Sequence, residues 1–251
     1  METNSIFETA LRELHNLALE SASMEGQNFT IISYMSIYRR SEKSSTIPSV
    51  LTPSMCLVLS GTKRINIGTE VIDYSVGEYL ASVIDVPVSG QVLEASHKMP
   101  YIGIRIDFTN DKIADVALRS KVGIKPQQKK GTLNAGAFVG KADIGLLHIL
   151  IHMLKLNNSK KEQPFLYDLY MQELIYNLLS SSYGHFLTQQ VQLFQQATGI
   201  GQAITWIKEN FEKSLTIEEL AKRNNMSSSS LHHKFKAIVT IGPKTTEVVG
   251  S

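Results

Sequence analysis

The sequence YIGIRIDF at residues 101–108 carries the clearest strand signal in the chain. Its large apolar side chains recur at every second position, at Ile102, Ile104, Ile106 and Phe108. The positions between them include Tyr101, Arg105 and Asp107. Because successive side chains of a strand point to opposite faces of a sheet, this alternation predicts a strand with one buried side.

Six further runs rich in Ile, Val, Tyr and Phe precede this strand. They are FTIISYMSIYRR (29–40), MCLVLS (55–60), RINI (64–67), VIDY (71–74), YLASVI (79–84) and PVSGQVLEA (87–95). Gly and Pro residues separate these runs at regular intervals. Many short strands with regular turns favour a β-sandwich or barrel over alternating βαβ units.

Helical periodicity replaces strand alternation on both sides of this region. Residues 5–20 predict a short amphipathic helix. Residues 110–120 are compatible with another helix. The segment 121–142 is polar and Gly-rich, so we interpret it as a loop whose lysines are solvated rather than bound to phosphate.

Two strongly apolar helices are predicted next. The first runs from Asp143, as its N-cap, to Asn157, and the second runs from Pro164 to about Ser182. Packing on the strands buries one side of this pair, and the same helices of a second subunit would bury the other. We therefore expect a homodimer. The Ser- and Gln-rich residues 180–198 are the expected hinge.

The sequence predicts no catalytic residue, metal site or cofactor. The single cysteine, Cys56, excludes an internal disulfide and any Cys-based zinc site. His97 is the only imidazole in the strand region, and one imidazole cannot hold a metal. His148 and His152 are four residues apart on a helix, but no Glu follows the first, so packing or interface roles are expected.

Composition points to a globular protein of a reducing cytoplasm. The 251 residues are 43% apolar and 19% charged, with a formal net charge of +2. No signal peptide or membrane-length apolar run is present, so we expect no membrane partner. Residues 200–251 hold seven Lys and Arg against five Asp and Glu, so all the excess positive charge lies at that end.

That basic end contains TIEELAKRNNMSSSSLHHKFKAIV at residues 216–239, which predicts two short helices joined by a tight turn. Thr216 is a suitable N-cap, and Glu219 completes a capping box. An Asn pair then ends the first helix, because Asn tolerates the left-handed conformation. Ser227 caps the second helix.

The second of these helices has an apolar back and a hydrogen-bonding, cationic front. Leu231, Phe235 and Ile238 form the apolar stripe. Such a front suits a helix lying in the major groove of DNA, although an ordinary helical hairpin with a solvated face has the same spacing. The predicted DNA contacts are Ser229, His232 and His233 at base edges, and Lys222 and Lys236 at phosphates.

The longer segment AITWIKENFEKSLTIEELAKRNNMSSSSLHHKFKAI, residues 203–238, resembles the first helix-turn-helix of the AraC family of bacterial transcription regulators. Its LTIEELA, MS and LHHKFKA pieces follow the family's order and spacing. Asn225 stands where the family usually has Gly in the turn. Family members carry a second helix-turn-helix, whereas the final IVTIGPKTTEVVGS has no helical apolar period. We therefore expect a truncated DNA-binding domain.

The strand region resembles the N-terminal domain of one AraC subgroup. The resemblance rests on LVLSGTKRINIG (57–68), GEYLASVIDVPVSGQVLEAS (77–96) and PYIGIRIDF (100–108), and it covers roughly residues 20–180. It implies a cupin-like barrel that senses a small-molecule effector or mediates dimerisation. It does not imply which ligand is bound.

We thus expect an α+β chain of three parts. These are a cupin-like effector-binding barrel with an N-terminal helix (1–142), a helical dimerisation or linker region (143–198) and a truncated AraC-type DNA-binding domain with the first helix-turn-helix only (199–251). The expected function is DNA-binding transcription regulation, weakened by the loss of the second motif. One alternative is a ligand-binding, dimerising remnant that does not bind DNA and sequesters a full-length relative. The other is a cupin enzyme, which the scarcity of ligand histidines disfavours.

Overall fold

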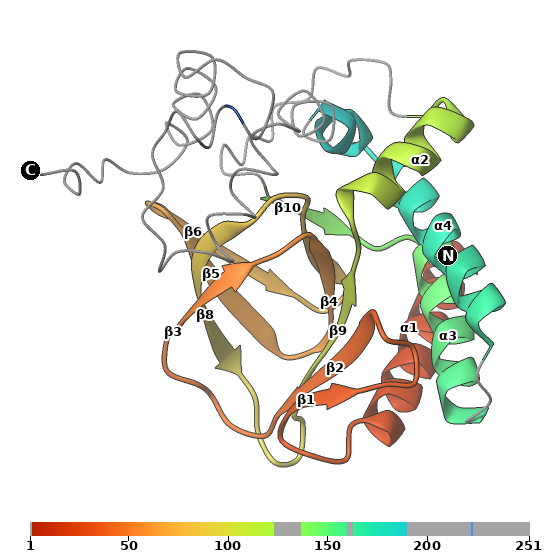
Figure 1. Cartoon of the computed structure of the whole chain (residues 1–251). Helices are drawn as coiled ribbons and strands as arrows, with labels where there is room; N and C mark the ends of the chain where they lie inside the picture. The colour runs from red at the N-terminus through yellow and green to blue at the C-terminus, as the bar shows by residue number, and fades with distance from the viewer. Residues whose placement is uncertain (1, 123–136, 160–162, 190–221, 223–251) are drawn as a thin grey trace, which may run out of the picture. The chain divides into compact units, whose positions relative to one another are not determined.

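The computed structural model describes residues 2–122, 137–159, 163–189 and Lys222 (Figure 1). The chain divides into two compact units, residues 1–188 and 189–251, and each is treated by itself. In the second unit only Gln189 and Lys222 are described. The finer boundaries predicted at residues 142 and 198 stay predictions.

In the part of the chain that the structure describes, ten strands form two antiparallel sheets. The six-stranded sheet has the order β1 (Gly26–Phe29), β2 (Met35–Arg40), β9 (Tyr101–Asp107), β4 (Ser54–Ser60), β7 (Glu78–Ser82) and β10 (Ala137–Lys141). The four-stranded sheet has the order β3 (Ile47–Leu51), β8 (Val86–Glu94), β5 (Thr62–Ile67) and β6 (Glu70–Ser75). The chain is therefore a mixed α/β structure with a strand-rich N-terminal region.

The two sheets enclose one apolar core. It contains buried residues of both sheets, among them Val58, Leu80, Ile65 and Val92. Strand pairing within the described residues does not connect the sheets into one closed barrel, because β3 and β6 end the smaller sheet and β1 and β10 end the larger one.

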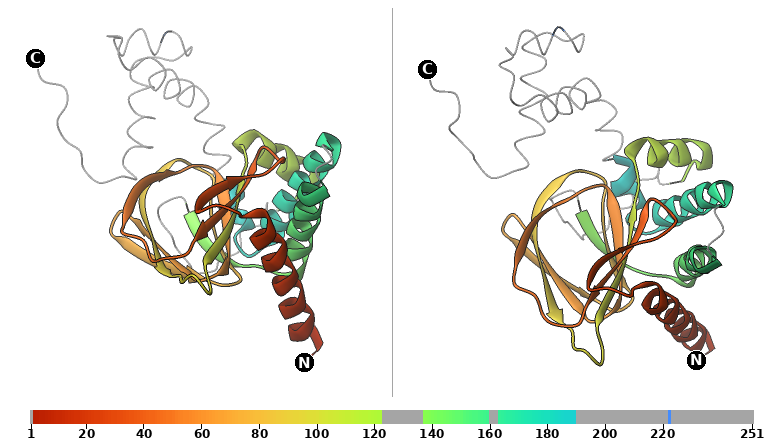
Figure 2. Two further views of the ribbon diagram at one scale, coloured as in Figure 1. Left: turned by 90° about the horizontal axis from the view of Figure 1, so that it is seen from below. Right: turned by 60° about the horizontal axis from the view of Figure 1, so that its bottom comes forward.

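The helices cover the outer face of the six-stranded sheet. They are α1 (Glu2–Ser21), α2 (Asn110–Ser120), α3 (Ile144–Ser159) and α4 (Pro164–Ser180). Helix α1 packs against α3, β4 and β9, with Leu14 and Ala18 fully buried at helical spacing. Helix α4 contacts both α2 and α3. All four lie on one side of the strands (Figure 1, Figure 2). None of the described helices is long and apolar enough to cross a lipid bilayer.

The central strand β9 corrects the expectation of a single buried side. Ile102, Ile104 and Ile106 are fully buried, as predicted. The alternate face is also enclosed: Tyr101 is only 2% exposed and belongs to the core between the two sheets. This strand is therefore packed on both faces, by the helices on one side and the second sheet on the other.

Strands β1, β3 and β10 are absent from the predicted runs, apart from Phe29 at the end of β1. Strand β3 contains Pro48, which cannot donate to a ladder and made the run look like a turn; β3 lies at a sheet edge, where proline is tolerated. Strand β10 falls in the Gly-rich segment expected to be a loop, so the loop prediction is wrong for residues 137–141. It pairs with β7, a partner more than fifty residues away, and local composition does not reveal such pairing.

The predicted N-cap of α3 is confirmed. Asp143 Oδ1 accepts the backbone N–H of Leu146 at 2.8 Å and also the Asn177 amide of α4 at 3.2 Å. The side chain thus satisfies a free donor at the helix start and ties α3 to α4.

We expect Asp143→Ala to lower the free energy of unfolding by about 1 kcal/mol, the usual cost of a lost cap. Asp143→Asn keeps an acceptor oxygen and should lose clearly less. Urea unfolding of both variants measures this. The control is Asp111→Ala, which removes an exposed carboxylate from the first turn of α2. Equal losses in the Ala and Asn variants would contradict the capping role.

Candidate functional site

Four of the five predicted DNA contacts lie outside the described residues: Ser229, His232, His233 and Lys236. Lys222 is described, in helical conformation and with an exposed side chain. That placement agrees with the predicted helix but does not test a phosphate contact. These five positions stay predictions.

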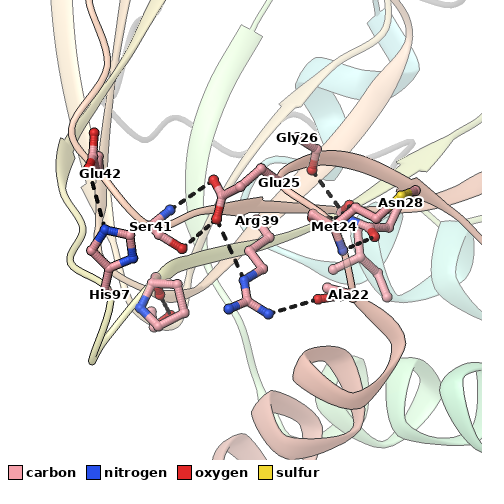
Figure 3. Close-up of polar contacts among 12 residues, drawn as sticks. Ala22, Met24, Glu25, Gly26, Asn28, Arg39, Ser41, Glu42 and His97 are labelled. Carbon is pink, nitrogen blue, oxygen red and sulfur yellow. Dashed lines mark hydrogen bonds and ion pairs between the residues drawn. The ribbon is translucent and has the colours of Figure 1, made fainter.

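The histidines singled out from the sequence lie at the surface, His97 in the strand region and His148 and His152 one turn apart on α3. His97 Nε2 is 3.4 Å from a carboxylate oxygen of Glu42, and both side chains are about four-fifths exposed (Figure 3). His148 and His152 are exposed on α3, where the His152 ring centroid lies 5.8 Å from that of Tyr170 on α4. No group of three metal-ligating side chains occurs among the described residues.

A polar joint fixes the end of α1 to the strands (Figure 3). The Glu25 carboxylate accepts the backbone N–H of Ser41 at 3.0 Å and also the Ser41 hydroxyl. Arg39 Nη1 donates to the Ala22 carbonyl at 3.1 Å. The Ser41 hydroxyl, more than the Arg39 charge, lowers the pKa of Glu25. This arrangement is structural, because its hydrogen bonds join the segment that follows α1 to the end of β2.

The interior of the strand region holds an unusual pair of phenols. Tyr74 on β6 and Tyr101 on β9 are 1% and 2% exposed, and neither hydroxyl has an oxygen or nitrogen hydrogen-bond partner among the described residues. The Cys56 thiol of β4 is their polar neighbour. Burial raises the pKa of both phenols well above the ordinary value, so both stay protonated and remain potential donors.

The same inner face of the six-stranded sheet opens at one end into a pocket of about 460 Å³. Polar side chains from β1, β2 and β9 meet the β3–β4 connection there. The lining residues are Gln27, Tyr38, Ser49, Val50, Thr52, Pro53, Arg105, Asp107 and Phe108. A concave site with several convergent polar groups is the usual form of a small-molecule site.

Arg105 is the centre of this pocket. Its guanidinium Nη2 lies 2.7 Å from Oδ1 of Asp107 and donates to the Thr52 hydroxyl at 2.7 Å, while Nε donates to the same Asp107 oxygen at 2.9 Å. Burial alone lowers the pKa of Arg105, but the hydrogen bond and charge of Asp107 outweigh it and the pKa is raised. Arg105 is therefore permanently charged, and its side chain is only 20% exposed.

Sequence reasoning placed Arg105 and Asp107 on the polar face of their strand but did not select them as site residues. The alternation gave their shared direction. It did not show that this direction leads into a pocket, because the residues that complete the pocket come from other strands and loops. A cation and an anion two residues apart on an otherwise buried strand are the signal that was available.

The chain is similar to known transcription regulators in sequence and in structure. The model of the AraC-type transcriptional regulator N-terminus matches residues 31–186. Among solved structures, ToxT from Vibrio cholerae O395 is similar with a TM-score of 0.39 at 11% identity, covering 83% of this chain and 94% of that one. ToxT from strain SCE256 with a bound unsaturated fatty acid gives 0.39 at 8% identity, covering 88% and 95%. The AraC-like transcriptional activator CuxR gives 0.42 at 14% identity, covering 84% and 73%. No curated protein sequence matches the chain.

We expect Tyr101→Phe to leave the free energy of unfolding unchanged or raise it by up to about 1 kcal/mol, because it removes a buried hydroxyl that has no oxygen or nitrogen partner. Tyr34→Phe is the matched control, since the Tyr34 hydroxyl donates to the Tyr167 carbonyl at 2.5 Å and its loss should destabilise. Urea unfolding separates the two. A clear loss in Tyr101→Phe would mean that its hydroxyl is hydrogen-bonded.

Gly103→Ala tests the packing of the same phenol. A Cβ at Gly103 would lie 2.6 Å from the Tyr101 hydroxyl oxygen, so we expect a loss of about 1–3 kcal/mol. The loss should shrink in the Tyr101→Phe background, where the nearest remaining ring atom is 3.2 Å away. A double-mutant cycle by urea unfolding measures this coupling, and additive losses would contradict the contact.

Proposed function

Because this chain belongs to the family of AraC-type transcriptional regulators through an N-terminal domain at residues 31–186, we propose that it is a cytoplasmic, DNA-binding transcription regulator that responds to a small-molecule effector. The family match over most of the described unit is the observation that carries the proposal. The family consists of regulators, and the prediction that the chain is not an enzyme is confirmed by this membership.

In this proposal the strand region acts as a cupin-like sensor. The support is the pair of sheets around one core, with an open polar pocket at the end of their inner face. The effector would occupy the pocket beside Arg105, where hydroxyl, amide and charged groups converge.

DNA contact is assigned to the helix-turn-helix pattern at residues 216–239. Ser229, His232 and His233 would meet base edges, with Lys222 and Lys236 at phosphates. The small positive excess of residues 200–251 supports binding that depends strongly on salt. The support here is sequence pattern, which the family membership of the N-terminal domain strengthens.

Recovery of random genomic fragments by the purified chain, at low and moderate salt, tests this function. We expect one class of sequence to be enriched at both salt concentrations. Uniform recovery that moderate salt abolishes would contradict sequence-specific binding. The chain would then be a ligand-binding, dimerising protein that does not read DNA.

His233→Ala should weaken binding to the enriched sequence by about 1–3 kcal/mol, the usual cost of a lost base contact. His97→Ala is the control, because it removes a histidine that is 81% exposed in the first unit and lies outside the proposed dimer helices. Fluorescence anisotropy with a labelled duplex gives both affinities. Equal affinities of the His233 variant and the wild type would remove this residue from the DNA interface.

We also propose a homodimer formed through α3 and α4. Phe165, Leu169 and Tyr176 are 76%, 45% and 48% exposed along one side of α4, at helical spacing. Large apolar side chains in such a row favour burial against another protein surface.

Light scattering at micromolar concentration should give twice the chain mass. Leu169→Glu should shift the protein toward monomer by placing a charge in the interface. Leu118→Glu is the control, since Leu118 is 79% exposed on α2 instead. A monomeric wild-type protein would contradict the proposal.

A further inference from the structure

We propose that the ligand of the Arg105 pocket is a small zwitterion, carrying a carboxylate and a protonated amine that pair with Arg105 and Asp107. This inference rests on the proposed effector role of the pocket and names the chemistry of its ligand. The two charged side chains supply the argument.

Only one of the two carboxylate oxygens of Asp107 takes part in its ion pair with Arg105. Both Arg105 nitrogens that reach Asp107 share a single carboxylate oxygen, Oδ1, at 2.7 and 2.9 Å. Within the described residues, no hydrogen bond engages Oδ2 of Asp107 or Nη1 of Arg105. The pair therefore keeps one carboxylate oxygen and one guanidinium nitrogen without a partner among the described residues.

A second Arg–Asp ion pair, in the four-stranded sheet, has both carboxylate oxygens engaged. On β5 and β6, Arg64 Nε and Nη2 donate at 2.7 Å to the two different oxygens of Asp73. That bidentate pair uses both carboxylate oxygens and does not line the pocket. At Arg105, in contrast, Nη2 donates to Thr52 as well as to Asp107, and both contacts to Asp107 use one oxygen.

Charge balance then selects the ligand. Arg105 and Asp107 are the charged side chains among the pocket residues, so the lining is neutral overall. A ligand of one sign would pair with one of them and be repelled by the other. A zwitterion places a carboxylate on the free Arg105 donor and an ammonium on the free Asp107 acceptor. Both contacts are charge-assisted and carry opposite full charges, whereas a polyol hydroxyl would bring no charge to either side chain.

The remaining lining residues fit a molecule with polar ends and a modest apolar body. Gln27, Ser49 and Tyr38 offer neutral hydrogen-bonding groups, and Val50 and Phe108 supply apolar surface. Tyr38 stays a donor, because burial raises its pKa. A volume of about 460 Å³ lies within the range of small-molecule sites.

Thermal-shift titration of the full chain tests this assignment. The probes are the twenty standard amino acids, with acetate and propionate as carboxylates alone, methylammonium and ethylammonium as amines alone, and glycerol as a polyol. At least one amino acid should raise Tm in a saturable way, and the single-charge probes and glycerol should not. Equal shifts by a monocarboxylate or by glycerol, or no shift by any probe, would overturn the proposal.

Variants locate the binding. Arg105→Gln and Asp107→Asn should each lower the affinity for the responding amino acid by about tenfold or more, the effect of one lost charge-assisted hydrogen bond. Arg64→Gln, which breaks the closed pair, should bind as the wild type does. Asp107 is 47% exposed, so its variant serves if Arg105→Gln does not fold. Unchanged affinity in Asp107→Asn would place the ligand elsewhere.

The DNA assays are independent of this pocket. Loss of zwitterion binding with retained sequence enrichment on DNA would overturn the ligand assignment and leave the regulator. Loss of DNA enrichment with retained zwitterion binding at Arg105 would overturn the DNA-binding function and leave the ligand assignment.

Discussion

The burial of β4 and β9 on both faces is the constraint on which the first unit depends. On the outer face, beneath the helices, four apolar side chains are fully buried: Met55, Leu57, Ile104 and Ile106. On the inner face, Val58 and Tyr101 belong to the core between the sheets. A strand in that position must satisfy its backbone through its neighbours, and β4 and β9 pair with each other and with β7 and β2. The helices are therefore part of the same core and cannot be treated as an addition to a complete strand region.

The same constraint explains how polar groups are distributed along the inner face. The buried polar side chains of this interior include the phenols of Tyr74 and Tyr101, the Cys56 thiol and the hydroxyls of Ser54 and Ser82. On β9, the ionised side chains Arg105 and Asp107 lie where the face opens, because burying an unpaired charge costs several kcal/mol. The gradient from neutral to charged side chains along one strand face marks the end at which a polar ligand can enter.

Strand β10 connects this interior with the last described segment of the unit. Ala137 is buried in the core between the sheets, while the next residue, Phe138, points to the opposite face. There its ring stacks on Tyr183 at 4.4 Å and meets Phe186 edge-on at 5.9 Å. Tyr183 and Phe186 lie just before the second unit in the sequence. A single edge strand thus contacts the core on one side and the end of the first unit on the other.

The sequence by itself determined the elements with strong periodicity. Alternation at residues 101–108 predicted β9, and apolar runs at helical spacing predicted α1, α3 and α4 with Asp143 as a cap. Family membership also followed from motifs in the strand region, because their order and spacing are linear properties of a chain. The DNA contacts remain predictions that rest on sequence order and spacing alone.

Only the tertiary structure decided what lies opposite each face. Periodicity assigned Tyr101, Arg105 and Asp107 to one side of a strand, and burial by a second sheet made that side part core and part pocket. Strands β3 and β10 likewise exist because of partners far away in the chain, β8 and β7. Pairing and enclosure arise between segments distant in sequence, and a local pattern holds no information about which segment will supply the other half.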